Sequence, residues 1–310
     1  MPWSLKKVSS LKLVVDSKGM FLPRKIREER LKKMLADDLG QGDVTADAII
    51  PPNLNVNAII LAKAEGIAAG IEEAMILVEG LGLKVKAEVS DGDKIKNKQV
   101  LMEVSGDAQT ILSVERTLLN LLSRMSGIAT TTRTLIEKLE KAGAKAKIAA
   151  TRKSPPGMLY FDKRAVIIGG GDPHRLHLDD MILIKDNHLS IIGNVEVAVK
   201  KAKARSSFTK KIEVEVTTVE DALKAAQAGA DIVMLDNFPP KQVKEAREML
   251  RKAGFGSALL EASGGITDKT LLEYAAAQVD IISMGELTHS VKALDISLEI
   301  SKGVGENRFT

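Results

Sequence analysis

Short apolar runs alternate with amphipathic helical stretches through the second half of the chain, and this alternation constrains the fold most. The seven runs are KIAAT (147–151), AVIIGG (165–170), MILIK (181–185), IEVEV (212–216), DIVMLD (231–236), ALLEAS (258–263) and DIISMG (280–285). Strand–helix units repeated at this spacing form parallel strands joined by right-handed crossovers. Because a separate module precedes them, they predict an incomplete α/β barrel of the TIM type, with a doubly wound sheet as the alternative.

The first half has a different pattern. Helical spacing over 21–40 and 71–81 predicts helices, and residues 42–52 read as a loop closed by two prolines. Apolar alternation over 83–89 and 100–104, separated by an Asp-Gly turn, predicts an antiparallel hairpin. These elements predict an N-terminal α+β domain built on a small antiparallel sheet.

A long helix starting near residue 109 joins the two patterns. The expected organisation is an N-terminal α+β domain over 1–118 and a catalytic α/β barrel over 119–286. We expect residues 287–310 to form a C-terminal helix that returns to the N-terminal domain.

Composition limits the class of protein. Of the 310 residues 45% are hydrophobic, enough for a sizeable core, but only 3% are aromatic. Few aromatic rings and a net charge of +4 argue against a nucleic-acid binder, which stacks bases on rings. The chain has no cysteine, no signal-peptide pattern at its start and no apolar run of membrane-spanning length. We therefore expect a cytoplasmic protein that binds neither nucleic acid nor membrane.

Polar residues and glycines follow most of the apolar runs. In a barrel these positions are the carboxyl ends of the strands, where the active site lies. These residues are Thr151, Arg152, Lys153, Lys185, Glu215, Asp236, Ser263, Gly264, Gly265, Ser283 and Gly285. One of them alone could be a solvated loop residue, but together they predict a single site.

Two glycine-containing loops after the last runs predict a phosphate site. Ser263-Gly264-Gly265 reads as opening a helix with Ile-Thr-Asp, and Ser283-Met284-Gly285 follows the final run. Small residues let backbone N–H groups approach a phosphate, and a helix N-terminus adds positive potential. His289 is a further donor candidate.

Charged residues at the strand ends predict the rest of the substrate. Glu215 and Asp236 end adjacent runs, and paired carboxylates near phosphates hold Mg²⁺, partly through water. Cationic side chains that converge on one pocket repel one another unless an anion binds, so they predict a substrate with several negative charges. The cationic residues are Arg116, Arg152, Lys153, His174, Arg175 and Lys185. Zinc on His174 and His177 is disfavoured, since no third ligand is evident in the sequence.

Several motifs together resemble the quinolinate phosphoribosyltransferase family (nicotinate-nucleotide pyrophosphorylase, decarboxylating). They are LADDLGQGDVT (35–45), ERTLLNLLSRMSGIATTTR (115–133), TRKSPPG (151–157), GGGDPHR (169–175), LIKDNH (183–188), EVEV (213–216), AGADIVMLDN (228–237), EASGGI (261–266) and SMGELTHS (283–290). Ser154 and Pro173 stand where the family usually has Thr and Asn.

The resemblance implies a two-domain fold, an N-terminal α+β sandwich domain and an incomplete α/β barrel. It also implies a pentosyltransferase that converts quinolinate and phosphoribosyl pyrophosphate to nicotinate mononucleotide, pyrophosphate and CO₂ in NAD biosynthesis. It implies quinolinate binding by Arg116, Thr151, Arg152, Lys153, His174, Arg175 and Lys185. It implies phosphoribosyl pyrophosphate binding by Glu215, Asp236, Ser263, Gly264, Gly265, Ser283, Gly285 and His289. The implied catalytic residues are Lys153, Lys185, Glu215 and Asp236, and the last two are the implied Mg²⁺ ligands.

The resemblance also implies an assembly. Arg116 would enter the neighbouring subunit's site, which requires a homodimer with shared sites, and a hexamer as a trimer of dimers would extend it. Three other functions stay open on the residues alone. They are a related transferase that does not decarboxylate its pyridine or base, a Schiff-base enzyme that uses Lys185, and a ligand-binding protein without catalysis.

Overall fold

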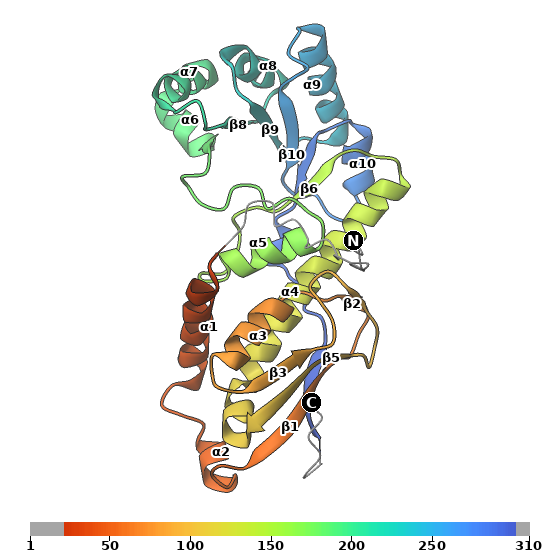
Figure 1. Cartoon of the computed structure of the whole chain (residues 1–310). Helices are drawn as coiled ribbons and strands as arrows, with labels where there is room; N and C mark the ends of the chain where they lie inside the picture. The colour runs from red at the N-terminus through yellow and green to blue at the C-terminus, as the bar shows by residue number, and fades with distance from the viewer. Residues whose placement is uncertain (1–21, 302–310) are drawn as a thin grey trace, which may run out of the picture.

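The computed structural model describes residues 22–301 and forms two domains stacked end to end (Figure 1). The lower, N-terminal domain contains a four-stranded antiparallel sheet in the order β12-β1-β5-β3. Its strands are β1 (Asn55–Ala62), β3 (Lys84–Ala87), β5 (Val100–Asp107) and β12 (Ile296–Ser301). The predicted pairing of 83–89 with 100–104 is confirmed, because Val85 lies opposite Val104 in the β3–β5 ladder.

Helices α1 (Arg24–Leu39), α3 (Ile71–Glu79) and the start of α4 (Ala108–Lys141) pack against one another in the N-terminal domain, where Leu31, Leu77 and Leu118 are fully buried. A short ladder of β2 (Gly66–Ile67) and β4 (Lys94–Ile95) lies apart from the main sheet. The predicted loop over 42–52 is wrong in part, since it contains α2 (Val44–Ile49). The Asp43 side chain accepts hydrogen bonds from the N–H groups of Thr45 and Ala46, an N-cap that stabilises this one-and-a-half-turn helix.

The expected helix over 287–310 is also wrong. The chain forms only α11 (Glu286–His289) and then β12, which pairs antiparallel with β1 and places Leu298 opposite Ile60. The alternating apolar residues Ile296, Leu298 and Ile300 fit one face of a strand, and the open edge of β1 supplies hydrogen bonds that a helix would not use. The return to the N-terminal domain thus occurs through a strand. Residues 302–310 lie outside the described part of the chain.

Helix α4 runs from one domain into the other without a break at Gly127 (Figure 1). A Cβ atom at Gly127 would overlap the carbonyl oxygen of Lys292, so this glycine lets the segment before β12 cross the helix closely. The predicted boundary at residue 118 falls inside this single helix.

The upper domain is a six-stranded parallel sheet in the order β6-β11-β10-β9-β8-β7, curved into a barrel that stays open between β6 and β7. The strands are β6 (Lys147–Ala149), β7 (Ile182–Ile184), β8 (Ile212–Val216), β9 (Ile232–Asp236), β10 (Leu259–Ser263) and β11 (Ile281–Ser283). Beside the opening, Asp172 forms a parallel bridge with Ala149. The incomplete α/β barrel is confirmed.

Helices cover the outside of the barrel sheet. They are α6 (Asp186–Ile192), α7 (Val195–Arg205), α8 (Val219–Ala228), α9 (Pro240–Lys252) and α10 (Leu271–Ala276). Val214, Val233 and Leu260 lie level with one another on neighbouring strands and are fully buried in the core beneath these helices.

The run AVIIGG (165–170), read above as a strand, is the end of helix α5 (Leu159–Ile168). Short apolar runs do not distinguish a buried helix from a buried strand, and residues 165–168 are all buried. Arg164 of this helix pairs with Glu73 of α3 at 2.8 Å, so α5 joins the two domains. Within residues 22–301, none of the helices combines the length and apolar character that crossing a bilayer requires.

Candidate active site

The inner face of the barrel is polar, and this follows from the two-residue period of the strands. In IEVEV, Ile212, Val214 and Val216 belong to the outer core, so Glu213 and Glu215 face inward. Glu261 lies level with Met234 and Met234 with Glu215, which places Glu261 on the same inner face. Barrel interiors are usually filled by apolar layers, so acidic residues there need a functional or ionic explanation.

The carboxyl ends of the strands bring predicted residues together in one row. Asp236, Ser263 and Ser283 are direct neighbours across β9, β10 and β11. On the adjoining strands, the Lys185 ammonium nitrogen lies 3.2 Å from Oε2 of Glu215. The Asp236 carboxylate accepts a hydrogen bond of 2.8 Å from the Asn237 amide. The row therefore presents a lysine, two carboxylates and small residues to one mouth of the barrel.

The loop after β10 has the shape expected of an anion loop but not the expected helix. Gly264 and Gly265 have φ values of +96° and +61°, which favour glycine. The predicted helix directly after them is wrong, because α10 begins only at Leu271. Thr267 and Thr270 form a turn in between, with the Thr270 hydroxyl accepting from the Thr267 N–H at 3.1 Å.

The loop after β11 meets the loop after β6. Gly285 packs beside His289, and its missing Cβ would lie 3.3 Å from Cδ of Lys153. The Thr288 hydroxyl donates a hydrogen bond of 2.7 Å to the Lys153 carbonyl, while the Thr151 hydroxyl accepts from the Lys153 N–H at 3.2 Å. The fold thus brings Lys153, a candidate for the acid site, against the candidate phosphate loop.

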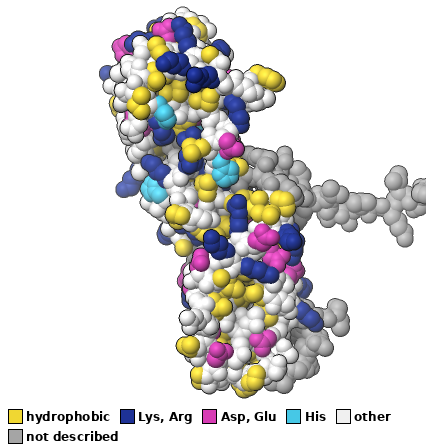
Figure 2. All heavy atoms as spheres, turned by 90° about the vertical axis from the view of Figure 1, so that its left-hand side faces the viewer, with side chains coloured by type: hydrophobic (Ala, Val, Ile, Leu, Met, Phe, Trp, Pro, Cys, Tyr) yellow, Lys and Arg dark blue, Asp and Glu magenta, His cyan; other side chains and the backbone are white. Residues whose placement is uncertain are grey.

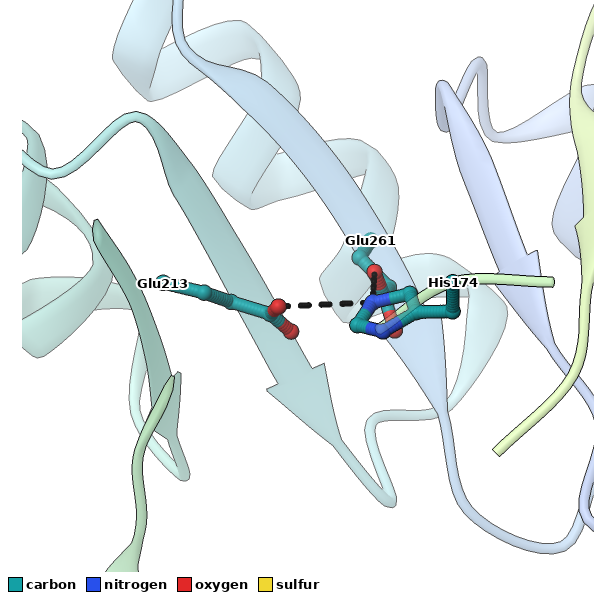
Figure 3. Close-up of side chains that lie close together, drawn as sticks. All are labelled: His174, Glu213 and Glu261. Carbon is teal, nitrogen blue, oxygen red and sulfur yellow. Dashed lines mark hydrogen bonds and ion pairs between the residues drawn. The ribbon is translucent and has the colours of Figure 1, made fainter. Parts of the chain in front are cut away.

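His174 enters the barrel interior and meets two buried carboxylates (Figure 3). Its Nε2 atom lies 3.2 Å from Oε2 of Glu261 and 3.3 Å from Oε2 of Glu213. Both glutamate side chains are fully buried, and the His174 side chain is 11% exposed. The Ser283 hydroxyl donates to Oε1 of Glu261 at 2.5 Å, so this hydroxyl faces the cluster.

The carboxylates keep His174 protonated. Burial alone would lower the pKa of His174, but pairing with Glu213 and Glu261 outweighs burial and raises the pKa to about 10. Burial, with the neighbouring charge of Glu261 adding to it, raises the pKa of the Glu213 carboxyl. His174 is therefore an imidazolium at neutral pH.

Hydrogen bonds from helix α5 and from within the loop itself fix the backbone that carries His174. Lys163 of α5 is fully buried and donates a hydrogen bond to the Pro173 carbonyl. The Asp172 carboxylate accepts from the His174 N–H at 2.9 Å. Sequence reasoning singled out neither of these residues, nor Glu213 and Glu261. The two-residue alternation in IEVEV and LLEAS contains the signal for both glutamates, because it places them on the polar face.

Further cations surround this loop. Burial and then the nearby charge of Arg152 lower the pKa of Arg175. Burial lowers the pKa of Lys163 to about 8, and the positive charges of Arg152 and Arg175 add to this effect. Histidines appear among Lys and Arg side chains over the barrel half of the face in Figure 2. Arg152, Lys163 and Arg175 thus act on one another near the His174 loop, where the carboxylates of Asp172, Asp180 and Glu213 offset part of their charge.

Arg116 is the predicted site residue that this chain does not bring to the barrel mouth. It is exposed on the first third of α4, beside Thr117, whose hydroxyl donates to Asp38 of α1 at 3.0 Å. Within residues 22–301, Arg116 forms no ion pair.

A cavity of about 430 Å³ lies toward the amino ends of the strands. It is lined by Lys147, Ala149, Asp172, His174, Arg175, Asp180, Met181, Thr209, Lys211, Ile232, Leu259, Asp280 and Ile281. Of the predicted site residues it includes only His174 and Arg175, so the His174 loop lies between this cavity and the barrel mouth.

Two groups of side chains have the chemistry of a cation site. Glu215 and Asp236 are partly exposed carboxylates on adjacent strands, which suits a hard cation held partly through water. His174, Glu213 and Glu261 each offer one ligand atom within 4.8 Å of the others. His177 is exposed and stands outside the second group.

Comparison with known proteins agrees with this architecture. Residues 43–126 match the model of the quinolinate phosphoribosyl transferase N-terminal domain, and residues 128–299 match that of the C-terminal domain. The chain is 46% identical over 274 residues to a probable nicotinate-nucleotide pyrophosphorylase [carboxylating] of Methanocaldococcus jannaschii, which covers 87% of this chain and 95% of that protein. It is 44% identical over 271 residues to the protein of the same description in Methanothermobacter thermautotrophicus, and this match covers 87% of this chain and 97% of that protein.

Solved structures give the same result. The nicotinate-nucleotide pyrophosphorylase from Francisella tularensis superimposes with a TM-score of 0.82 at 35% identity, covering 91% of this chain and 98% of that one. Both domain models and relatives of nearly full length agree in sequence and in fold. This chain therefore belongs to the quinolinate phosphoribosyltransferase family.

Proposed function

We propose that the chain catalyses its family's reaction, the nicotinate-nucleotide pyrophosphorylase (carboxylating) step of NAD biosynthesis, at the carboxyl ends of the barrel strands. In the biosynthetic direction, quinolinate and phosphoribosyl pyrophosphate give nicotinate mononucleotide, pyrophosphate and CO₂. One observation supports this location above the others. Lys153, the Lys185–Glu215 pair and the glycine loops lie at one mouth, where the two ammonium groups suit a substrate with several negative charges.

The acid site in this proposal is formed by the cationic side chains at the His174 loop and at the ends of the neighbouring strands. Arginine side chains bind carboxylates through paired N–H donors, and quinolinate has two carboxylates to satisfy. The residues assigned to it are Thr151, Arg152, Lys153, His174, Arg175 and Lys185. Arg116 of a second copy would complete the site, since Arg116 is exposed and unpaired within residues 22–301 and lies on the N-terminal part of α4. A homodimer with shared sites follows from that assignment.

The donor site in this proposal adjoins the acid site at the same mouth, since Lys153 lies against Gly285 and Lys185 pairs with Glu215. Ser263, Gly264, Gly265, Ser283, Gly285 and His289 are assigned to the 5-phosphate, whose oxygens would accept backbone N–H groups from the two glycine loops. Glu215 and Asp236 are assigned to the ribose and to Mg²⁺. When bound there, Mg²⁺ would neutralise charge on the pyrophosphate oxygens.

The residues of the chain position both substrates for displacement at the ribose carbon. The bond from this carbon to the pyrophosphate oxygen breaks, and the pyridine nitrogen supplies the electron pair of the new bond. Lys153 and Lys185 are placed to stabilise charge on the departing pyrophosphate and the acid, while Glu215 and Asp236 favour the positive charge that develops on the ribose. No general base is needed, because the attacking nitrogen bears no proton.

Decarboxylation follows from the positive ring. The carbon–carboxylate bond next to the pyridinium nitrogen breaks, its electron pair stays on the ring carbon, and this carbon then takes a proton from water. The acid site must therefore hold the other carboxylate firmly and the departing one less firmly, since an ion-paired carboxylate loses stabilisation as it becomes neutral CO₂.

The deciding experiment incubates purified protein with Mg²⁺, phosphoribosyl pyrophosphate and quinolinate labelled in the carboxylate next to the ring nitrogen. We expect nicotinate mononucleotide, pyrophosphate and labelled CO₂ in equal amounts. Parallel reactions with nicotinate test for a transferase that does not decarboxylate, and borohydride trapping on Lys185 tests for a Schiff base. Turnover of nicotinate without turnover of quinolinate would contradict the proposal.

A further inference from the structure

A buried charge cluster sits behind the proposed acid site, and the reaction chemistry does not use it directly. Glu213 and Glu261 lie on strands β8 and β10, separated by β9, and both reach the same nitrogen of His174 (Figure 3). The Glu261 carboxylate has a second donor in the Ser283 hydroxyl. Neither oxygen of Glu213 has a hydrogen bond of good geometry, so its charge depends on the ion pair with His174 and on nearby Arg175.

The backbone of His174 is fixed as firmly as its ring. Its φ of +53° is unusual for a residue with a side chain, and such a conformation persists only when neighbours impose it. Lys163 binds the preceding carbonyl, and Asp172 binds the His174 N–H. The loop therefore meets α5 on one side and the inner faces of β8 and β10 on the other.

Charge balance favours a proton over a metal ion in this cluster. The imidazolium of His174 already compensates one of the two carboxylates, and the cations Arg152, Lys163 and Arg175 act on the same region. A divalent cation would require His174 to lose its proton and would raise the net positive charge beside these groups by one. The distance of 3.2 Å from Nε2 to Oε2 of Glu261 suits N–H⁺ donation, and the 3.3 Å to Oε2 of Glu213 is an ion-pair contact.

We propose that Glu213 and Glu261 are positioning residues that hold the His174 side chain as a fixed imidazolium in the acid site. This inference rests on the proposed function for its substrate and goes beyond it in the residues that it assigns. The Nε2 side of the ring is taken by the two carboxylates, which leaves Nδ1–H to meet a substrate carboxylate. Orienting a donor before binding lowers the cost of binding.

Glu213→Gln and Glu261→Gln test the proposal, because each keeps the side-chain shape and removes a charge. We expect each variant to raise the KM for quinolinate about tenfold or more, as for removal of one charge from a buried ion pair. The KM for phosphoribosyl pyrophosphate should stay within about twofold in Glu213→Gln, since the one ion pair of Glu213 within residues 22–301 is with His174. Glu261→Gln also changes the acceptor of the Ser283 hydroxyl, a donor-site residue, so this comparison is made with Glu213→Gln alone. Glu213→Asp, which keeps the charge, should recover part of the affinity. Glu245→Gln, at an exposed position on α9, is the matched control.

NMR of the His174 ring nitrogens reports whether the imidazole is protonated, and a loss of packing alone would not change that protonation state. The wild-type ring should stay doubly protonated at pH 8, and the ring in either glutamine variant should be neutral there. The double variant Glu213→Gln/His174→Gln completes a double-mutant cycle for quinolinate affinity. If Glu213 acts through His174, the double variant should bind quinolinate no worse than His174→Gln alone.

Several results would overturn the inference. They are unchanged affinity for quinolinate in both folded glutamine variants, a neutral His174 ring in the wild type, and full additivity in the cycle. Stoichiometric metal in the purified protein that disappears in Glu213→Gln would replace it with a metal centre. Wild-type protein that does not turn over quinolinate would instead refute the proposed function, so the two failures are distinguishable.

Discussion

A Cβ atom at Gly264 would overlap the Oδ1 atom of Asn237, so the loops after β10 and β9 touch only because residue 264 has no side chain. Asn237 itself has a φ of +56° and donates to Asp236. Asn237 therefore connects the proposed phosphate loop, which it contacts at Gly264, to the proposed Mg²⁺ ligand Asp236, to which it donates a hydrogen bond.

Gly264→Ala should push these loops apart. We expect a loss of about 1–3 kcal/mol in the free energy of unfolding from the positive φ and the overlap. The KM for phosphoribosyl pyrophosphate should rise about tenfold, whereas the KM for quinolinate should change less. Urea melts and steady-state kinetics measure both. Gly254→Ala is the control, since its φ of +85° is similar but no atom lies within 4 Å of the added Cβ.

Removal of divalent cations should abolish turnover, and Mg²⁺ should restore it. Asp236→Asn should lower kcat/KM for phosphoribosyl pyrophosphate about a hundredfold, because it removes a charge that faces the donor. Isothermal titration of Mg²⁺ with pyrophosphate should show weaker binding to this variant. Full activity after exhaustive chelation would contradict the assignment of Glu215 and Asp236.

Arg124→Met should destabilise the junction between the domains. Arg124 of α4 makes two hydrogen bonds, of 2.7 and 2.8 Å, to the fully buried Asp162 of α5, and a third to the Thr288 carbonyl. The variant leaves a buried carboxylate unpaired, which costs about 3–5 kcal/mol of folding free energy. Lys200→Met, which breaks an exposed pair with Glu196, should cost under about 1 kcal/mol. Equal losses of folding free energy in Arg124→Met and Lys200→Met would show that burial of the Asp162 carboxylate does not strengthen its pairing with Arg124.

His174 should make folding stability depend on pH in the alkaline range. Its pKa rises from 6.5 to about 10 on folding, so the folded state binds the proton more tightly. This stabilisation is complete below about pH 6.5 and is lost as the pH rises through about 10. The stability advantage of wild type over His174→Gln should therefore fall with rising pH, by at most about 1.4 kcal/mol per unit. A constant difference between pH 7 and 10 would show that His174 is not held as an imidazolium.

Much of the fold could be predicted from local pattern, because hydrophobic period depends on sequence alone. The runs at 212–216, 231–236 and 258–263 are strands, and their polar ends lie together as expected. The errors occurred where local signals are ambiguous. The run at 165–170 is apolar in either conformation, and the segment around 296–301 becomes a strand only because β1 offers an open edge.

The sequence by itself determined the barrel, the polar strand ends and the cation-rich composition of the site, since all three follow from residue type and spacing. Only the tertiary structure decided which charges meet. Lys163 and Asp172 come together with Glu213 and Glu261 around His174 from α5, the adjacent loop and two strands of the barrel. Apart from the local contact of Asp172 with His174, these contacts join residues from 10 to 87 positions apart, and hydrophobic periodicity carries no information on contacts between residues so far apart.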